Sequence, residues 1–151
     1  MIKKTDHSSH HKSKMIYEVF QVSYAVEATI LKHDNFPPLQ RTADQIQQSE
    51  NVFYGYFLEE EMGAVVELEH YDNHIHIRSL CVIPQYFRQG IGRKLLHFVV
   101  DQFEAALITV ETGHANQPAV DFYLSFGFNK DKVWMTDVGI EKISFTLTRS
   151  S

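Results

Sequence analysis

Residues 80–96, LCVIPQYFRQGIGRKLL, constrain the fold more than any other part of this sequence. An apolar run typical of a buried strand leads into a proline-containing loop, and a helical pattern begins around Gly90 and Gly92. The first backbone N–H groups of a helix have no partner within the helix, and the helix dipole makes them a site for an anion such as phosphate. Glycines let a ligand oxygen approach the backbone where a Cβ atom would block it. The stretch therefore predicts a strand, a phosphate-binding turn and a helix in succession.

Two common phosphate motifs do not account for this turn. Lys94 is not preceded by glycines in the register that a GxxxxGK[ST] loop requires, and position 95 is a leucine where GxGxxG has its third glycine. The turn is therefore a phosphate-binding loop of another type. The side chains of Arg88, Arg93 and Lys94 can add charge-assisted contacts to it.

The rest of the chain alternates between helical and strand patterns without an internal repeat. Thr42 and Gln45 form a capping-box pattern that predicts the start of a short helix. The strand-helix-strand-helix passage over residues 74–128 implies at least one parallel crossover, so the sheet is expected to be mixed. Helices are expected over residues 15–31, 42–49, 90–103 and 118–126, and strands over residues 51–58, 64–70, 74–83, 107–111, 128–134 and 141–149.

The pattern also makes two finer predictions. A period of two over residues 74–83 places the odd-numbered side chains on one face of the sheet and the even-numbered ones, including His76 and Leu80, on the other. The first fourteen residues are rich in His, Lys and Ser, so residues 1–14 are expected to be loosely held and residues 15–151 to form a single domain. Residues 1–4 also fit the beginning of an edge strand.

Composition excludes several classes of protein. With 14 Lys+Arg against 19 Asp+Glu the net charge is -5, which argues against a nucleic-acid binder. No apolar stretch approaches the roughly 20 residues that span a bilayer, and the first residues lack the apolar segment of a secretory signal. Cys81 is the single cysteine, which excludes an intrachain disulfide and favours a cytoplasmic location. No metal site is expected, because His70, His74 and His76 do not form a recognisable ligand set and a single strand would present such ligands in an awkward arrangement.

A second stretch, residues 116–128 (NQPAVDFYLSFGF), resembles a signature of the GNAT family of N-acetyltransferases, N-x-x-A-x-x-x-Y-x-x-x-G-F. The turn at Gly90 and Gly92 resembles the acetyl-CoA motif of the same family, [QR]-x-x-G-x-[GA], and the two motifs occur in the family's order and separation. Phe87 departs from this pattern, since it stands where the motif has Gln or Arg. Arg88, the next residue, has a polar side chain that can take that place. The signature positions are Asn116, Ala119, Tyr123, Gly127 and Phe128.

The resemblance covers nearly the whole chain and implies an acyl-CoA N-acyltransferase fold of the mixed α/β class. Such a fold has a mostly antiparallel sheet of six to seven strands flanked by about four helices. Its two central parallel strands splay apart, and the pantetheine arm of acetyl-CoA lies between them. Main-chain groups at the end of the first of these strands would bind that arm, and amides of the following turn would hold the pyrophosphate. The residues expected to bind acetyl-CoA are Leu80, Cys81, Val82, Arg88, Gln89, Gly90, Ile91, Gly92, Arg93, Lys94 and Asn116.

The implied reaction is direct transfer of acetyl from acetyl-CoA to a primary amine of a small molecule or a protein. An acetyl-CoA-binding sensor or interaction module without turnover is the alternative. Tyr123 is at the position of the family's general acid, and a phenol with a pKa of about 10 can donate a proton to the leaving thiolate. The simpler interpretation is a tyrosine of the core or pocket wall. Asn116 either orients the backbone or cofactor, or simply caps the helix that follows it.

The general base is predicted less directly. His76 lies four residues before Leu80, where several family members have a Glu or His base, and an imidazole can accept the amine's proton. His74 lies on the same strand face and can relay that proton, although a half-exposed strand histidine without catalytic role fits equally well. Alternative bases at strand positions are Glu67, Glu69 and Glu111.

The acceptor site is expected to lie among the first two helices, the loop over residues 33–41 and the final strand pair. Side chains there carry no recognisable signature, but the acidic balance of the chain favours a cationic amine. The resemblance allows a homodimer, because family members are often dimers, but no residue pattern in the chain fixes the oligomeric state.

Overall fold

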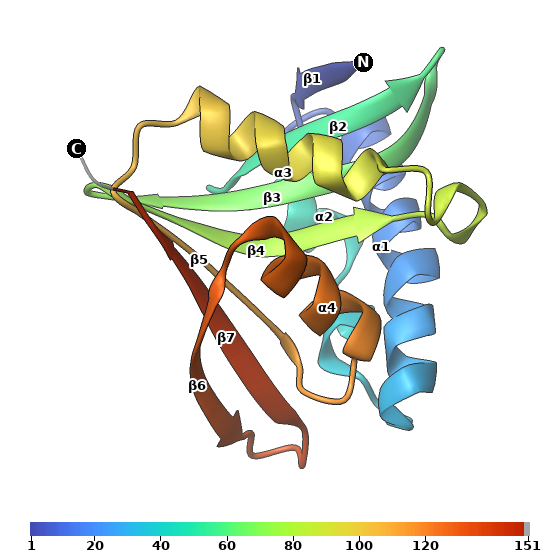
Figure 1. Ribbon diagram of the computed structural model, residues 1–151. Coiled ribbons are helices and arrows are strands. Elements are labelled where there is room, and N and C mark those ends of the chain that lie inside the picture. Colours follow the sequence, from blue (N-terminus) through green and yellow to red (C-terminus); the bar gives the residue numbers. More distant parts are fainter. Residues whose placement is uncertain (150–151) are drawn as a thin grey trace.

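The computed structural model describes residues 1–149, and its centre is a seven-stranded sheet in the order β1-β2-β3-β4-β5-β7-β6 (Figure 1). Neighbouring strands are antiparallel except β4 and β5, which are parallel. The predicted mixed and mostly antiparallel sheet is confirmed. The strands are β1 (Ile2–Thr5), β2 (Val52–Leu58), β3 (Glu61–Tyr71), β4 (His74–Val82), β5 (Leu107–Gly113), β6 (Asn129–Met135) and β7 (Glu141–Thr148).

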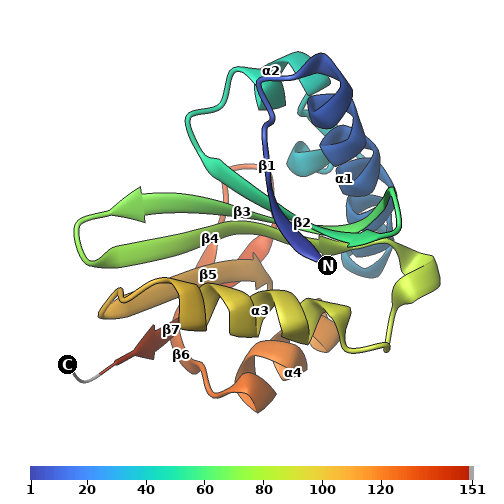
Figure 2. The same cartoon turned by 90° about the horizontal axis from the view of Figure 1, so that it is seen from above.

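Helices cover both faces of the sheet (Figure 2). One side carries α1 (His10–Leu31) and α2 (Ala43–Gln47), and the other carries α3 (Ile91–Gln102) and α4 (Gln117–Phe126). Two apolar clusters correspond to these layers, because each helix buries its apolar face against the sheet. The capping box that begins α2 is present as predicted, since Thr42 accepts from the Gln45 backbone and Gln45 bonds back to Thr42. The cluster under α1 includes Ile16, Phe20 and Ile46, and that under α3 and α4 includes Leu95, Leu96, Val99 and Val120.

The N-terminal segment differs from the expectation that residues 1–14 are loosely held. Strand β1 pairs with β2 along its length, and the ammonium group of Met1 donates to the Phe57 carbonyl at 2.9 Å. Helix α1 begins at His10, because Ser9 caps it by accepting from the Lys12 N–H. Pairing to a buried strand and a serine cap therefore order a segment whose composition alone favours disorder.

A bulge in β4 changes which side chains share a face. Glu67 of β3 pairs with Ser79, but the next residue, Leu68, pairs with Ile77, so Arg78 is an extra residue in β4. Ile77 therefore packs in the cluster under α3 and α4, whereas Cys81 packs in the cluster under α1. The prediction that all odd-numbered side chains of residues 74–83 share one face was wrong, because a period of two does not survive an inserted residue.

The parallel pair β4–β5 opens at the same place. Its pairing runs from His74 with Leu107 to Ile77 with Val110, and beyond these residues the two strands diverge (Figure 1). Residues 80–82 keep their partners on β3 but have none on the β5 side within residues 1–149. The sheet thus has an opening that exposes one backbone edge of β4. Within residues 1–149, no helix is both long enough and apolar enough to cross a membrane.

Candidate active site

A cavity of about 600 Å³ occupies the opening between β4 and β5, and we call it the first cavity. Its wall combines α1, the end of β4, the turn before α3, the end of β5 and the start of α4. Both motifs of the sequence therefore contribute to one space, although Gly90 of the first and Asn116 of the second are 26 positions apart along the chain. The predicted residues that line it are Leu80, Cys81, Val82, Arg88, Gly90, Ile91, Gly92, Arg93, Asn116 and Tyr123.

The turn at the start of α3 presents free backbone donors to the first cavity. Gly90 is the N-cap with a φ of 76°, and no side chain caps the helix. The first backbone bond of the helix runs from the Lys94 N–H to the Gly90 carbonyl at 3.0 Å. The N–H groups of Ile91, Gly92 and Arg93 thus have no partner within the helix. A Cβ at Gly90 would meet no atom within 4 Å, so the space beside this N-cap residue is open.

The basic side chains near this turn separate into two groups. Arg88 and Arg93 line the first cavity, and the Arg93 guanidinium lies 5.4 Å from the centre of the Phe126 ring. Lys94 instead lies over Tyr56 at 5.9 Å, and Gln89 donates to the Gln85 carbonyl at 3.3 Å. Neither Lys94 nor Gln89 is among the residues that line the cavity. Two of the eleven residues predicted to bind acetyl-CoA therefore lie outside it.

The far end of the first cavity is formed by β4 and by Tyr123 of α4. Residues 80–82 offer the free backbone edge, and burial raises the pKa of the Cys81 thiol to about 12, so this thiol stays protonated. Tyr123 is 6% exposed and packs against the rings of Phe128 and Phe145, both at 5.6 Å. Burial raises the pKa of Tyr123 well above its ordinary value of 10.0, and its hydroxyl makes no hydrogen bond to a described residue. The cavity thus contains a protonated and unengaged phenol.

Asn116 links α4 to α1. Its side-chain oxygen accepts from the Ala119 N–H, which confirms the predicted capping role. Its amide nitrogen also donates to Glu27 Oε2 at 2.6 Å, and Thr112 Oγ1 donates to the same oxygen at 2.8 Å. The sequence did not predict a role for Glu27, because α1 contains no motif and Glu27 lies 89 positions before Asn116.

A second cavity, of about 1,070 Å³, lies on the α1 side of the sheet. It is formed by α1, residues 36–41, β4, β5 and the connection between β6 and β7, which is the region where the acceptor site was expected. The two cavities are adjacent, because six residues line both. These shared residues are Tyr24, Glu27, Arg78, Ser79, Glu111 and Thr112.

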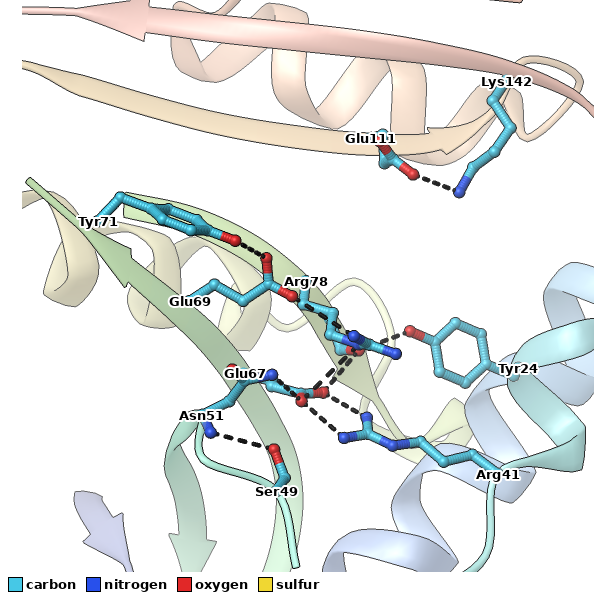
Figure 3. A network of polar contacts seen from close by, with 11 residues as sticks. Tyr24, Arg41, Ser49, Asn51, Glu67, Glu69, Tyr71, Arg78, Glu111 and Lys142 are labelled. Atoms are coloured by element: carbon cyan, nitrogen blue, oxygen red, sulfur yellow. Dashed lines mark hydrogen bonds and ion pairs between the residues drawn. The ribbon is translucent and has the colours of Figure 1, made fainter. Parts of the chain in front are cut away.

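A buried ionic cluster supports the wall of the second cavity (Figure 3). Glu67 is fully buried and accepts from both terminal nitrogens of Arg41, at 2.6 and 2.8 Å, and from Asn51 Nδ2 at 2.8 Å. Ser79 donates to Glu67 at 3.2 Å and accepts from the Tyr24 hydroxyl at 2.9 Å. Burial alone would raise the pKa of Glu67, but the hydrogen bonds and charge of Arg41 outweigh it and hold that pKa below 4.5. Glu67 is therefore an ionised structural group, and it lines neither cavity.

His76 lies in the second cavity and not in the first. Its Nδ1 and the Nε2 of His74 both contact the Thr109 hydroxyl at 2.7 Å, so one hydroxyl joins the two rings. Burial lowers the pKa of His76 below 6.5, which favours a neutral imidazole. The other predicted bases are engaged with cations: Glu111 accepts from Lys142 at 2.6 Å, and Glu69 lies 3.4 Å from Arg78.

Known proteins share this architecture. Residues 14–128 match the Acetyltransferase (GNAT) family. The UPF0157 protein YqkA of Bacillus subtilis (strain 168) is 36% identical over 134 residues, which are 86% of this chain and 38% of YqkA. The chain thus spans about two fifths of that curated relative.

Solved structures agree with the family match. The ribosomal-protein-S18-alanine N-acetyltransferase from Escherichia coli has a TM-score of 0.78 at 22% identity, over 100% of this chain and 94% of that one. The PaiA N-acetyltransferase from Thermoplasma acidophilum, in complex with coenzyme A, has a TM-score of 0.74 at 18% identity, over 95% and 96%. These similarities confirm the predicted fold. The family match covers residues 14–128, which is most of the chain, and the opened β4–β5 pair and the uncapped turn before α3 agree with it. The chain therefore belongs to the acetyltransferase (GNAT) family.

Proposed function

We propose that this chain transfers the acetyl group of acetyl-CoA directly to a primary amine of a small molecule or a protein. One observation carries the proposal: the first cavity joins free helix N–H donors, an unpaired strand edge and a protonated phenol, and it shares part of its wall with a second cavity. The names of the two similar solved structures, both N-acetyltransferases, support the same reaction class. Acetyl-CoA is the cosubstrate in this proposal.

The N–H groups of residues 91–93 and the side chains of Arg88 and Arg93 would bind the diphosphate, since they are the donors and cations along that wall. The free edge of Leu80, Cys81 and Val82 would pair with the amide groups of pantetheine as a neighbouring strand does. A main-chain N–H there would also polarise the thioester carbonyl. Gln89 and Lys94 would contribute only through the backbone of the turn or from its rim.

The chemistry requires one bond to form and one to break. A neutral amine in the second cavity attacks the acetyl carbon, the C–N bond forms, and the C–S bond breaks. Tyr123 would donate a proton to the departing thiolate, because its raised pKa keeps the phenol protonated. His76 would accept the proton that the amine loses. The Thr109 hydroxyl and His74 would then carry this proton away from His76 toward the surface.

The test is a pair of measurements on the same protein. Calorimetry measures acetyl-CoA binding, and release of the CoA thiol is followed with a panel of primary amines that includes alkylamines, amino acid amides and short peptides. Binding together with amine-dependent thiol release supports the enzyme. Binding without release from any amine would instead support the acetyl-CoA sensor, and no binding would contradict both. A cytoplasmic location and a homodimer stay predictions, which cell fractionation and light scattering test.

Replacing Gly90 by glutamate should weaken acetyl-CoA binding by more than about tenfold, or about 1.4 kcal/mol. The new carboxylate would enter the open space beside the N-cap and repel the diphosphate. Calorimetry with acetyl-CoA measures the effect. Gly139→Glu is the matched control, because Gly139 also has a positive φ (80°) and open space, but it does not line the first cavity. Equal affinities of the two folded variants would contradict the proposed diphosphate site.

Replacing His76 by glutamine should lower kcat/KM by about tenfold at neutral pH and remove the acidic limb of the pH profile. Because burial lowers the pKa of His76, the neutral and active ring persists to a pH below 6.5, and activity should fall only below that value. The rate of thiol release against pH measures this. A variant that keeps the wild-type acidic limb would show that water or another group accepts the proton.

A further inference from the structure

Glu27 of α1 has a position that none of the motifs explains. It is half-buried and lines both of the adjacent cavities. Thr112 of β5 and Asn116 at the start of α4 both donate to its Oε2 atom, at 2.8 and 2.6 Å. Its second oxygen, Oε1, accepts no hydrogen bond from the described residues. The carboxylate is thus held from two elements while one oxygen stays available.

The other acidic side chains around the second cavity are differently placed. Glu69 and Glu111 each have a cation within 3.4 Å, namely Arg78 and Lys142. Asp137 is exposed at the rim, where water solvates its charge. Among the residues that the structure describes, Glu27 is therefore the half-buried carboxylate of this cavity without a cationic partner. A charge removed from water in this way is stabilised when an opposite charge binds beside it.

The two donors also fix the orientation of the carboxylate. The Asn116 oxygen accepts from the Ala119 N–H, so its amide nitrogen must point toward Glu27. Thr112 lies just beyond the last residue of β5 that pairs with β4. Because Glu27 lines both cavities, its carboxylate lies at the boundary between the proposed acetyl-CoA site and the second cavity, where an acceptor amine has to arrive.

We infer that Glu27 binds the ammonium group of the acceptor, and that the acceptor class is accordingly primary alkylamines, which are protonated at neutral pH. This inference rests on the proposed function and extends that function by naming the residue that selects a positively charged acceptor. Arylamines and other amines that are neutral at this pH gain nothing from Glu27. The ammonium form binds and gives one proton to His76, and the neutral amine then attacks the acetyl carbon.

The experiment compares wild-type protein with Glu27→Gln and with Glu18→Gln. Glutamine keeps an oxygen that can accept from Thr112 and Asn116 but removes the charge, and Glu18 is an exposed residue of the same helix outside both cavities. For the best alkylamine of the panel, Glu27→Gln should raise KM by about tenfold or more and change kcat far less. KM for acetyl-CoA and the rate with hydroxylamine, which is uncharged at neutral pH, should stay at wild-type values, as should every value for Glu18→Gln.

A binding measurement separates this inference from the proposed reaction. The CoA complex of each protein is titrated with n-butylammonium and with 1-butanol, which have the same chain but differ in charge. A wild-type preference for the cation that is lost in Glu27→Gln supports the inference even if no amine is acetylated. Equal binding of both probes by the wild type, no binding of either, or an equal loss of both in Glu27→Gln would overturn it, the last result showing a structural role.

Discussion

Replacing Arg41 by alanine should lower the free energy of unfolding by about 3 kcal/mol, because the change leaves a buried carboxylate without its principal partner. Glu67 is fully buried, and Arg41 provides it with two hydrogen bonds of 2.6 and 2.8 Å. Asn51 and Ser79 would remain as neutral donors, at 2.8 and 3.2 Å, so the loss is at the lower end of the range for broken buried pairs. Urea denaturation followed by tryptophan fluorescence and circular dichroism measures it.

Arg78 provides a matched control for the same carboxylate. Its Nε lies 3.9 Å from Glu67 and its side chain is 51% exposed, so Arg78→Ala should cost no more than about 1 kcal/mol. The difference in the free energy of unfolding between wild type and Arg41→Ala should also depend on pH. Because Arg41 lowers the pKa of Glu67 in the folded state, this stabilisation is fully present above 4.5 and is lost as the pH falls through the lowered value. Equal costs for the two arginines, or a difference that persists in acid, would contradict this account.

The sequence predicted the parts of this molecule that depend on local patterns. The turn at Gly90, the capping box at Thr42 and the helix that ends at Gly127 each depend on residues within a few positions of one another. Their backbone conformations are determined by neighbouring side chains and by glycine, so a single sequence contains the necessary information. The mixed character of the sheet followed from the crossover over residues 74–128, whereas the order of its strands was not predicted.

The parts that could not be predicted depend on contacts between distant residues. Glu67 was predicted as an alternative general base from its position on a strand, but its carboxylate pairs with Arg41, 26 residues away. Glu27 and Asn116 meet across 89 residues. A single inserted residue, Arg78, moved Cys81 to the face opposite Ile77. Neither ion pairing nor a bulge leaves a local signal, because both are decided by how the strands and helices pack.

These distant contacts also explain why the acceptor site had no signature. Its wall comes from α1, the loop before α2, β4, β5 and the turn before β7, and none of these segments supplies more than a few of the lining residues. The acetyl-CoA motifs, in contrast, lie in two continuous segments that face a ligand of fixed chemistry. The cosubstrate could therefore be predicted from the sequence. For the acceptor the sequence offered only the acidic balance of the chain, and Glu27, the residue that we infer to bind a cationic amine, was found from its position in the structure.

Replacing Tyr123 by phenylalanine should lower kcat by about 100-fold, the effect expected when a positioned general acid is removed. The ring would keep its contacts with Phe128 and Phe145, and the lost hydroxyl bonds no described residue. The melting temperature and the acetyl-CoA affinity should therefore stay at wild-type values. Thiol release under saturating acetyl-CoA and amine measures kcat, and calorimetry measures the affinity.

Two other tyrosines make this prediction specific. Tyr17→Phe removes a hydroxyl from a residue of α1 that lines neither cavity, so it should leave kcat unchanged. Tyr24 lines both cavities, but its hydroxyl donates to Ser79 at 2.9 Å, so Tyr24→Phe should mainly reduce stability, by about 1 kcal/mol. Because burial raises the pKa of Tyr123 above 10.0, wild-type activity should show no loss from phenol ionisation up to that pH. A Tyr123→Phe enzyme with wild-type kcat would show that water protonates the thiolate, and a larger loss in Tyr24→Phe would assign the proton donor to α1.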